Sequence, residues 1–508
     1  MRGRRIPIAL PNTGALARKR NSFYLRAFLV ICLVLFAVLQ LHLINSPDYR
    51  EQHSINELAN DSSAAILQMV PVVYRKFLTM KPRNQTNNNK SLNGTNEGRN
   101  HPTVLSHVEE ILRNIARYNE LQSVLNEDLF GPLANDSVII VIQVHTRVEY
   151  LRHLIVSLAQ AKDISKTLVI FSHDYYDENI NDLVQTIDFC KVLQIFYPYS
   201  IQTHEHEFPG EDPNDCPRNL KRDQAIARKC NNALYPDLYG HYREAKFTQT
   251  KHHWWWKANR VFDQLDVTRH HTGLVLFLEE DHYVAEDFLH LLELMQKRAN
   301  ELCARCNILS LGTYLKTFNY YTYANVNKKS SSGDGMLRMK TEKRATETWG
   351  YQILPTLYST YQKVEVIPWI SSKHNMGFAF NRSTWREIVR CANHFCTYDD
   401  YNWDWSLQHV SQQCLQKKLH AMVVKGPRVF HIGECGVHHK KKNCESNQVI
   451  SKVQQVLRIA SKSHQLYPKM LTLTVASVVK KSKLRKGNGG WSDVRDHNLC
   501  LNVTWASY

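Results

Sequence analysis

The chain has 508 residues, of which 43% are hydrophobic and 22% charged, and it carries a formal net charge of +17. This composition is too apolar for a disordered chain and too polar for a protein with many membrane spans, and 19 Gly and 16 Pro are too few for a collagen-like or low-complexity sequence. The length allows one large domain or two to three ordinary ones, while the positive charge raises the question of a nucleic-acid partner.

A membrane anchor is predicted near the N-terminus. Seven Lys and Arg residues and no acid precede position 27, and residues 27–44 contain no Asp, Glu, Lys or Arg. A helix of this length, extended by residues 23–25, matches the hydrocarbon thickness of a bilayer. The alternative is a cleaved signal peptide, but residues 45–48 (NSPD) offer no small-x-small cleavage site. We therefore expect a cytoplasmic tail (1–26), a type II signal anchor (27–44) and a lumenal remainder, which excludes a nucleic-acid partner.

The next segment, residues 45–105, reads as a glycosylated stem. Four Asn-X-Ser/Thr sequons cluster between positions 60 and 95, in a polar stretch without apolar periodicity, and three more follow at Asn135, Asn381 and Asn502. Ten of the twelve cysteines lie between positions 216 and 500; the other two are Cys32 in the apolar span and Cys190 on an expected buried strand. An even ten in an oxidising lumen suggests five bridges, whose connectivity the spacing leaves open.

From about residue 105 the pattern alternates between strands and helices. Strands are predicted over 137–145, 167–172, 192–196 and 273–278, and helices over 147–161, 178–187 and 243–264. Such alternation implies βαβ units and an α/β fold with a mainly parallel sheet. Ligands bind at the carboxyl ends of the strands of such sheets. The residues that leave these strands are therefore the first candidates for a site.

Polar groups follow three of the predicted strands. QVHTR (143–147) leaves the first, His173-Asp174 leaves the second, and EEDH (279–282) leaves the fourth. Acids directly after an apolar strand are costly unless they bind a cation or face water, and hard oxygen ligands suit Mg²⁺ or Mn²⁺. A solvated acidic loop is the alternative for the tetrad alone. Asp174 suits hydrogen bonds to ribose or uracil, and Arg147 suits a phosphate.

Three further segments carry candidate chemistry. CTYDDYNWDW (396–405) interleaves acids and aromatic rings as sugar sites do, and Asp404 between two Trp suits a general base; an aromatic core patch with a capping Asp is the alternative. QTKHHWWW (249–256) offers Lys251 and its two following histidines for donor contacts, with the Trp triplet in the core. His431 in RVFH becomes a metal ligand only if an acidic site lies near it.

These segments resemble the N-acetylglucosaminyltransferase II family of the Golgi. The matching motifs are QVHTR (143–147), VIFSHD (169–174), GHYREAKFTQTKHHWWWK (240–257), LFLEEDHY (276–283), LSLGTY (309–314), HNMG (374–377), CTYDDYNWDW (396–405), CGVHHKK (435–441) and GGWSDVRDHNLC (489–500). They are long, occur in order and span roughly residues 137–500. The type II plan of tail, anchor and stem also matches such enzymes.

The resemblance implies a lumenal GT-A catalytic domain over 106–508 and a defined reaction. GlcNAc would pass with inversion from UDP-GlcNAc to O2 of the α1,6-linked mannose of an N-glycan, converting hybrid to complex type, with Mn²⁺ as cofactor. By motif position, Asp404 is expected to be the base, Trp403 an acceptor contact, and Asp281 and His431 the metal ligands. The donor set would be Gln143, Val144, His145, Thr146, Arg147, Asp174, Gln249, Thr250, Lys251, His252 and His253. The implied disulfides are Cys216–Cys230, Cys303–Cys306, Cys391–Cys414, Cys396–Cys500 and Cys435–Cys444.

One segment departs from the family pattern. Between Tyr314 and His374 the chain is longer and includes the polar run 327–335, so an enlarged loop is expected there. Two alternatives to the main prediction are another metal-dependent lumenal glycosyltransferase, and a carbohydrate-binding module with a degenerate metal site. Of the net +17, seven charges flank the anchor and +10 remains on residues 27–508, where it would favour an anionic nucleotide-sugar.

Overall fold

The computed structural model describes residues 66–79, 104–313, 362–433, 446–462, 464–475 and 486–505. The chain divides into two compact units, Met1–Gln68 and Met69–Tyr508, and of the first only residues 66–68 belong to the described ranges. The predicted tail, anchor and sequon cluster lie outside the described residues, as does most of the enlarged loop. Within the described ranges, no helix has both the length and the apolar character needed to cross a membrane.

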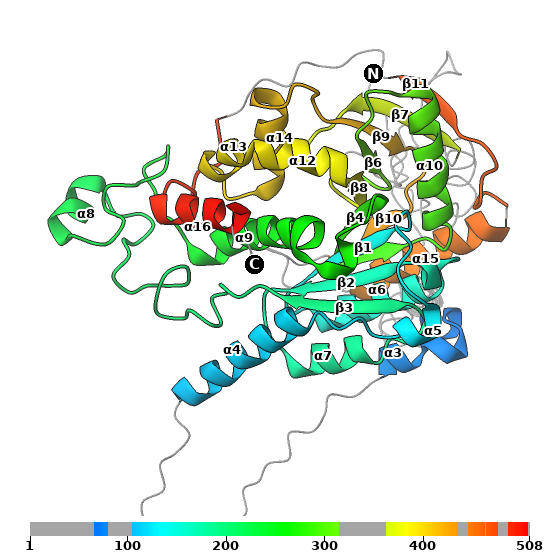
Figure 1. Ribbon diagram of the computed structural model, residues 1–508, viewed down its shortest axis with the longest axis horizontal. Helices are drawn as coiled ribbons and strands as arrows, with labels where there is room; N and C mark the ends of the chain where they lie inside the picture. Colours follow the sequence, from blue (N-terminus) through cyan, green and yellow to red (C-terminus); the bar gives the residue numbers. More distant parts are fainter. Residues whose placement is uncertain are drawn as a thin grey trace, which may run out of the picture. The chain divides into compact units, whose positions relative to one another are not determined.

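A mixed sheet with nine strands in its described part forms the centre of the second unit (Figure 1). Its order is β11-β7-β9-β6-β8-β4-β1-β2-β3. The strands are β1 Ile139–Val144, β2 Leu168–His173, β3 Lys191–Phe196, β4 Leu274–Glu279, β6 Ile308–Ser310, β7 Lys363–Pro368, β8 Phe378–Asn381, β9 His420–Val424 and β11 Thr472–Val475. Strands β3, β2, β1 and β4 are parallel, whereas β8 runs antiparallel to β4 and β6. A separate antiparallel pair joins β5 (His282–Val284) to β10 (Val429–His431).

Each face of the sheet carries its own apolar core, because successive side chains of a strand point to opposite faces. Ile140, Ile142 and Val144 pack with α6, α7 and α10, while Ile139 and Val141 pack with the Trp-rich helix α9 and with α12, α13, α14 and α16. These helices are α6 Val148–Ala159, α7 Glu178–Gln185, α9 Ala245–Asn259, α10 Phe288–Leu302, α12 Arg382–Arg390, α13 Ala392–Thr397, α14 Trp403–Gln413 and α16 Val494–Trp505. Burial on both faces explains why the strands read as unbroken apolar runs.

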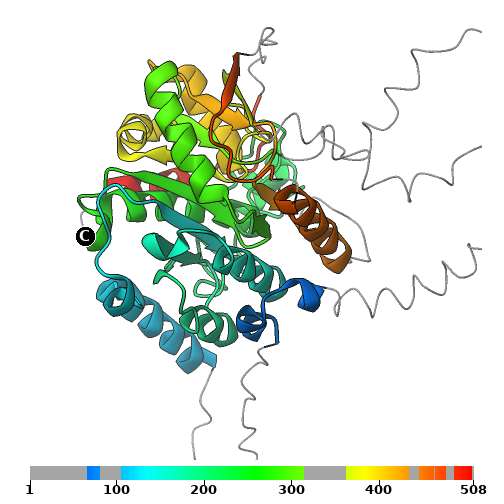
Figure 2. The same cartoon turned by 90° about the vertical axis from the view of Figure 1, so that its right-hand side faces the viewer.

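Further helices surround this arrangement. They are α3 Lys76–Thr79, α4 Val104–Leu121, α5 Glu127–Phe130, α8 Arg222–Arg228 and α15 Ser446–Lys462, with short turns at η1 Val72–Tyr74, η2 Ile164–Lys166 and η4 Asp266–Thr268. Helix α4 contacts the edge strand β3, and α15 lies on the opposite side of the sheet from the C-terminus (Figure 2). The four strands and three helices predicted from the sequence are confirmed. The last of those helices continues beyond α9 as a π-helix, η3 (Arg260–Gln264).

Part of the predicted stem is packed rather than solvated. Phe77 of α3 is 1% exposed and belongs to the apolar core that contains α6. Arg152 Nη1 donates to the Phe77 carbonyl at 2.8 Å, and Lys76 Nζ lies 2.5 Å from the Asp188 carboxylate. Val70 and Phe77 thus give residues 70–79 an apolar face that is buried in the second unit, while the boundary predicted at residue 106 stays a prediction.

Four of the five expected disulfides are present, and the fifth pair lies outside the described residues. The bridges are Cys216–Cys230, Cys303–Cys306, Cys391–Cys414 and Cys396–Cys500. The unplaced pair is Cys435 and Cys444. Cys190, immediately before β3, is a buried free cysteine.

Candidate active site

The parallel register brings three polar segments to one edge of the sheet. Gln143 of β1 pairs with Ser172 of β2 on one side and Glu279 of β4 on the other, so the three strands end at the same level. The segments QVHTR, His173-Asp174 and EEDH therefore emerge side by side, as the sequence predicts for a βαβ sheet.

Glu280, which follows β4, is hydrogen-bonded to the segment that follows β1. Its carboxylate accepts from the His145 backbone N–H and from Arg147 Nε, each at 2.7 Å. Arg147 Nη1 also donates to Asp281 Oδ2 at 2.8 Å. Burial alone would lower the pKa of Arg147, but Asp281 and Glu280 outweigh it and raise the pKa, so the guanidinium stays charged at this edge.

The β5–β10 pair brings His431 to Asp281. His431 stands opposite His282 in the antiparallel register, and its Nε2 lies 3.1 Å from Asp281 Oδ2. A fully buried ion pair between Arg428 and Asp287, at 2.8 and 3.0 Å, fixes the start of β10. Burial would lower the pKa of His431, but its hydrogen bond to Asp281 raises it. The two predicted metal ligands thus meet although 150 residues separate them in the sequence.

The residues around Asp281 fit a divalent cation. Asp281 is 2% exposed, and its Oδ1 has no hydrogen-bond partner among the described residues. A Cβ on Gly433 would lie 2.3 Å from Asp281 Oδ2, so a glycine is needed beside the carboxylate. Glu279, Asp281 and His282 have ligand atoms within 4.8 Å of one another. His282 Nδ1, however, accepts the Glu279 N–H, which leaves the proton of a neutral ring on Nε2. This occupied Nδ1 makes His282 a poorer candidate ligand than His431, whose Nε2 lies 3.1 Å from Asp281 Oδ2.

A chain of polar contacts joins the end of β2 to α9. The Asp174 carboxylate contacts His145 Nδ1 at 2.7 Å and His253 Nδ1 at 3.3 Å, and His253 Nε2 lies 2.8 Å from Ser172 Oγ. Burial would raise the pKa of Asp174, but the two histidines lower it well below its usual range. One turn further along α9, Lys257 Nζ donates to Gln143 Oε1 at 2.5 Å. Together these contacts set the side chains of Gln143 and Asp174.

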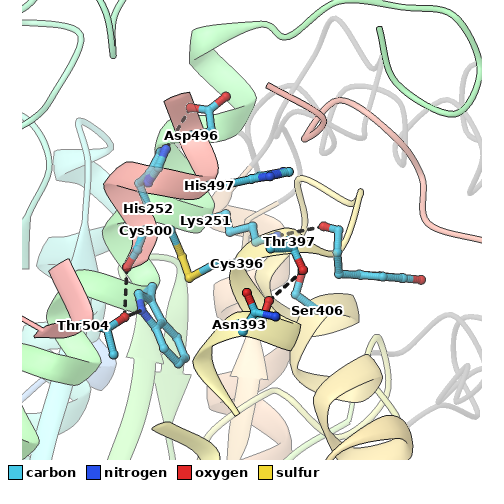
Figure 3. Close-up of a disulfide and its surroundings, with 12 residues drawn as sticks. Lys251, His252, Asn393, Cys396, Thr397, Ser406, Asp496, His497, Cys500 and Thr504 are labelled. Atoms are coloured by element: carbon cyan, nitrogen blue, oxygen red, sulfur yellow. Dashed lines mark hydrogen bonds and ion pairs between the residues drawn. A yellow bond between two sulfur atoms is a disulfide. The ribbon is translucent and has the colours of Figure 1, made fainter. Parts of the chain in front are cut away.

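The predicted donor residues on α9 do not all reach this edge. His253 contacts Asp174, whereas Gln249 Oε1 accepts the Ile201 N–H and Thr250 is exposed. Lys251 Nζ donates to the carbonyls of residues 398 and 400, and His252 Nε2 lies 2.9 Å from Asp496 (Figure 3). The structure therefore directs Lys251 and His252 toward the loop before α14 and toward α16. Of the other predicted donor residues, Val144 is buried in the sheet and Thr146 is exposed.

Asp404 lies at the same edge of the sheet. It stands in the first turn of α14, and its Oδ2 accepts from the Ser372 N–H at 3.0 Å and from Asn375 Nδ2 at 3.3 Å. Because β8 is antiparallel to β4, with Phe378 opposite Phe277, the turn before β8 that carries these donors lies where β4 ends. Burial raises the pKa of Asp404 to about 6, against hydrogen bonds from the Ser372 and Trp405 N–H groups. A carboxylate tuned in this way is suited to general-base catalysis.

Trp403 lies in the core and not on an open sugar-binding face. It is 7% exposed and stacks on Trp254 with ring centroids 4.5 Å apart at 3°, and on Phe378 at 5.6 Å. The predicted acceptor contact of Trp403 stays a prediction, and the burial and stacking of its ring argue against it. The sequence alternative of an aromatic core patch with an Asp beside it describes this residue, while Asp404 itself remains half-buried.

Sequence reasoning missed the groups that hold the candidate residues. Ser372 adopts φ +59°, a left-handed conformation rare for serine, and directs its N–H at Asp404. HNMG was a matching motif, yet nothing in its composition pointed to Asn375 as a partner of Asp404. Likewise, RVFH drew attention to His431 and not to Arg428, whose ion pair with Asp287 joins residues 141 positions apart.

The sequence matches the family described as N-acetylglucosaminyltransferase II (MGAT2) over residues 112–349 and 350–500. The chain belongs to the N-acetylglucosaminyltransferase II family. A relative from Rattus norvegicus, alpha-1,6-mannosyl-glycoprotein 2-beta-N-acetylglucosaminyltransferase, is 42% identical over 75% of this chain and 77% of its own length. A relative of the same name from Arabidopsis thaliana is 32% identical over 74% and 77%, respectively. The solved structure of S. aureus TarS 1-349 covers 65% of this chain and 73% of its own at 9% identity and a TM-score of 0.26, too low for a structural comparison.

Proposed function

We propose that this member of the N-acetylglucosaminyltransferase II family transfers GlcNAc from UDP-GlcNAc to O2 of the α1,6-linked mannose of N-glycans, converting hybrid to complex type. The supporting observation is that Asp404, a half-buried carboxylate whose pKa is about 6, lies at the same sheet edge as Asp281 and His431. Membership in the family and the names of its relatives support the choice of donor and acceptor. The GT-A type of the fold belongs to the same proposal.

The proposed reaction is a single inverting displacement. O2 of the mannose attacks C1 of GlcNAc and forms the new C–O bond, while Asp404 takes the proton of the O2 hydroxyl. The bond between C1 and the β-phosphate oxygen breaks, and its electron pair leaves with UDP. An attack opposite the leaving group converts the α linkage of the donor into a β linkage. One base suffices, so no covalent nucleophile on the protein is required.

The remaining residues would bind the donor. Asp281 and His431 would hold Mn²⁺, which supplies positive charge to the diphosphate of the donor. Arg147 carries a permanent charge beside them and would pair with a phosphate oxygen. Asp174 and His145, already hydrogen-bonded to each other, offer an acceptor and a partly exposed ring for the nucleoside.

The deciding experiment measures GlcNAc transfer from UDP-GlcNAc to a hybrid-type glycan that carries GlcNAc on its α1,3 arm. We expect transfer by the native protein and none by Asp404→Asn, with glycan binding retained. Full activity in Asp404→Asn would refute the base, and activity in excess EDTA would refute the metal. Glycan binding without UDP release by the native protein would favour a carbohydrate-binding module instead.

We further propose that the enzyme resides in the Golgi membrane with its catalytic domain in the lumen. The basic segment before position 27, the uncharged stretch 27–44 and four disulfides support this orientation. Protease added outside sealed Golgi vesicles should remove only the first 26 residues. Digestion of residues 45–508 under these conditions would place the domain in the cytoplasm and refute the proposal.

A further inference from the structure

Lys251 carries an amino group that no solvent reaches, and burial lowers the pKa of this group to about 7, against the nearby Asp400 and Asp399. It is 0% exposed, in the middle of α9, and its Nζ donates to the Asp400 carbonyl at 2.9 Å and the Tyr398 carbonyl at 3.1 Å. The ammonium also lies 4.0 Å from the centre of the Trp491 ring and 5.2 Å from that of Phe395. A donor sugar could contact this ammonium only by displacing these partners, and a buried amine that lost them would be strongly destabilised.

The loop that Lys251 holds leads directly into the helix that carries Asp404. Asp400 is 1% exposed, and its carboxylate accepts from both nitrogens of Asn402 and both nitrogens of Asn488. The Asp400 carbonyl, besides accepting from Lys251, accepts from Ser406 Oγ in the first turn of α14. The backbone of Asp400 is therefore fixed from two sides, four residues before Asp404.

The C-terminal segment also contacts Lys251 and the loop around Asp400. Trp491 Nε1 donates to the Cys396 carbonyl at 2.7 Å, and the Cys396–Cys500 disulfide ties α13 to α16. Figure 3 shows Lys251 beside this disulfide and His252 pointing to Asp496. Trp491, three residues before α16, thus contacts the Lys251 amine with its ring and the Cys396 carbonyl with its Nε1, so α9, α16 and the disulfide all contact the segment that leads to α14.

Helix α9 therefore contacts both halves of the site. His253 contacts Asp174 at the end of β2, and Lys251, two positions earlier, contacts the loop that leads to Asp404. We propose that Lys251 is a positioning residue that sets the place of Asp404 relative to the strand ends and makes no contact with the donor. This inference rests on the proposed role of Asp404 as the base. It reassigns Lys251 from the donor set that the sequence predicted.

The test separates donor affinity from turnover in full-length Lys251→Met, which keeps the length of the side chain and removes its charge. Lys246→Met, on the exposed face of α9, is the matched control. We expect UDP affinity, measured by calorimetry with Mn²⁺, to stay within about twofold while kcat falls by about tenfold or more, because small displacements of a catalytic group are costly. Weaker UDP binding with kcat retained would overturn the proposal and restore a donor contact.

A second variant covers the case in which Lys251→Met does not fold. Asn488 is exposed and holds the Asp400 carboxylate from the solvent side, so Asn488→Ala should fold. We expect a loss of kcat of about threefold or more with UDP affinity unchanged. If kcat of the folded protein is unchanged in both variants and only the melting temperature falls, the cluster is merely structural and the inference is wrong. Activity retained in Asp404→Asn would instead refute the base, a separate result.

Discussion

Asn375 should tune the pKa of Asp404. Its Nδ2 donates to Asp404 Oδ2 at 3.3 Å, and its own Oδ1 is buried without a hydrogen-bond partner among the described residues. Substitution by Ala therefore removes one bond to the charged carboxylate and leaves no new polar group unpaired. A hydrogen bond to a charged group contributes about 1.5–3 kcal/mol, and one pKa unit corresponds to about 1.4 kcal/mol. The long distance favours the lower end of that range, so we expect the pKa to rise by about one unit.

The sign of the effect on activity follows from the role of the base. Asp404 must be deprotonated to accept the hydroxyl proton, so kcat/KM falls as the pH drops through the pKa of Asp404, which is about 6 in the native protein. In Asn375→Ala this fall should occur near pH 7, about one unit higher. At pH 6.5 the variant should then retain about one third of the native kcat/KM, while the two should agree above about pH 8.5.

The assay is a pH profile of kcat/KM for GlcNAc transfer between pH 5 and 9. Asn393→Ala, an exposed asparagine on α13, serves as the control and should keep the native profile. If the pH at which kcat/KM falls on the acid side is unchanged in Asn375→Ala, or is lower than in the native protein, the argument is refuted. If kcat/KM at high pH is lower in the variant but its acid-side fall occurs at the native pH, Asn375 acts on something other than the charge of Asp404.

Three other changes test separate parts of the structure. Mn²⁺ at about 100 times its Kd should stabilise the native protein by about 2.7 kcal/mol, seen as a rise in melting temperature, and this rise should vanish in Asp281→Asn; an equal rise in the variant would contradict the metal assignment. Arg243→Met leaves Asp496 buried without its 2.8 Å ion pair and should lower the free energy of unfolding by about 3–5 kcal/mol in urea titrations; a loss below about 1 kcal/mol would contradict this. Trp403→Ala removes a ring stacked on Trp254 and should cost about 3–5 kcal/mol of stability with the acceptor KM of the folded protein unchanged; a raised KM at native stability would restore the acceptor contact.

The strand ends of the candidate site were predictable because they depend on local patterns. Parallel strands place their carboxyl ends at one edge, so Asp174 and Asp281 could be assigned to it from the sequence alone. Asp404 could be singled out by its flanking Trp residues, but its distance from the other groups could not be predicted. That distance depends on β8 entering the sheet antiparallel to β4, which no local period encodes.

Residues with several chemically reasonable partners were harder to assign. Lys251 and His252 are polar residues on a helix next to the site, so a donor contact was a natural expectation. Their partners are the loop around Asp400 and the carboxylate of Asp496, which come from segments about 150 and 240 positions later. Helical periodicity shows which residues share a face of α9, but it does not show which distant segment covers that face.

The Cys396–Cys500 disulfide between α13 and α16 also bears on the order in which the candidate site is assembled during synthesis. Cys396 emerges from the ribosome 104 residues before its partner Cys500, and both Cys391 and Cys414 are available to it in the meantime. Thiolate exchange can correct a wrong early pairing only while the chain is accessible to it. Since Asn488, Trp491 and Cys500 all follow β11, the last described strand, a nascent chain can complete this sheet while the loop before Asp404 still lacks its contacts to residues 488–500. The loop before Asp404 therefore gains its last contacts only after residues 488–500 have been made, and a chain truncated before residue 488 should lack them.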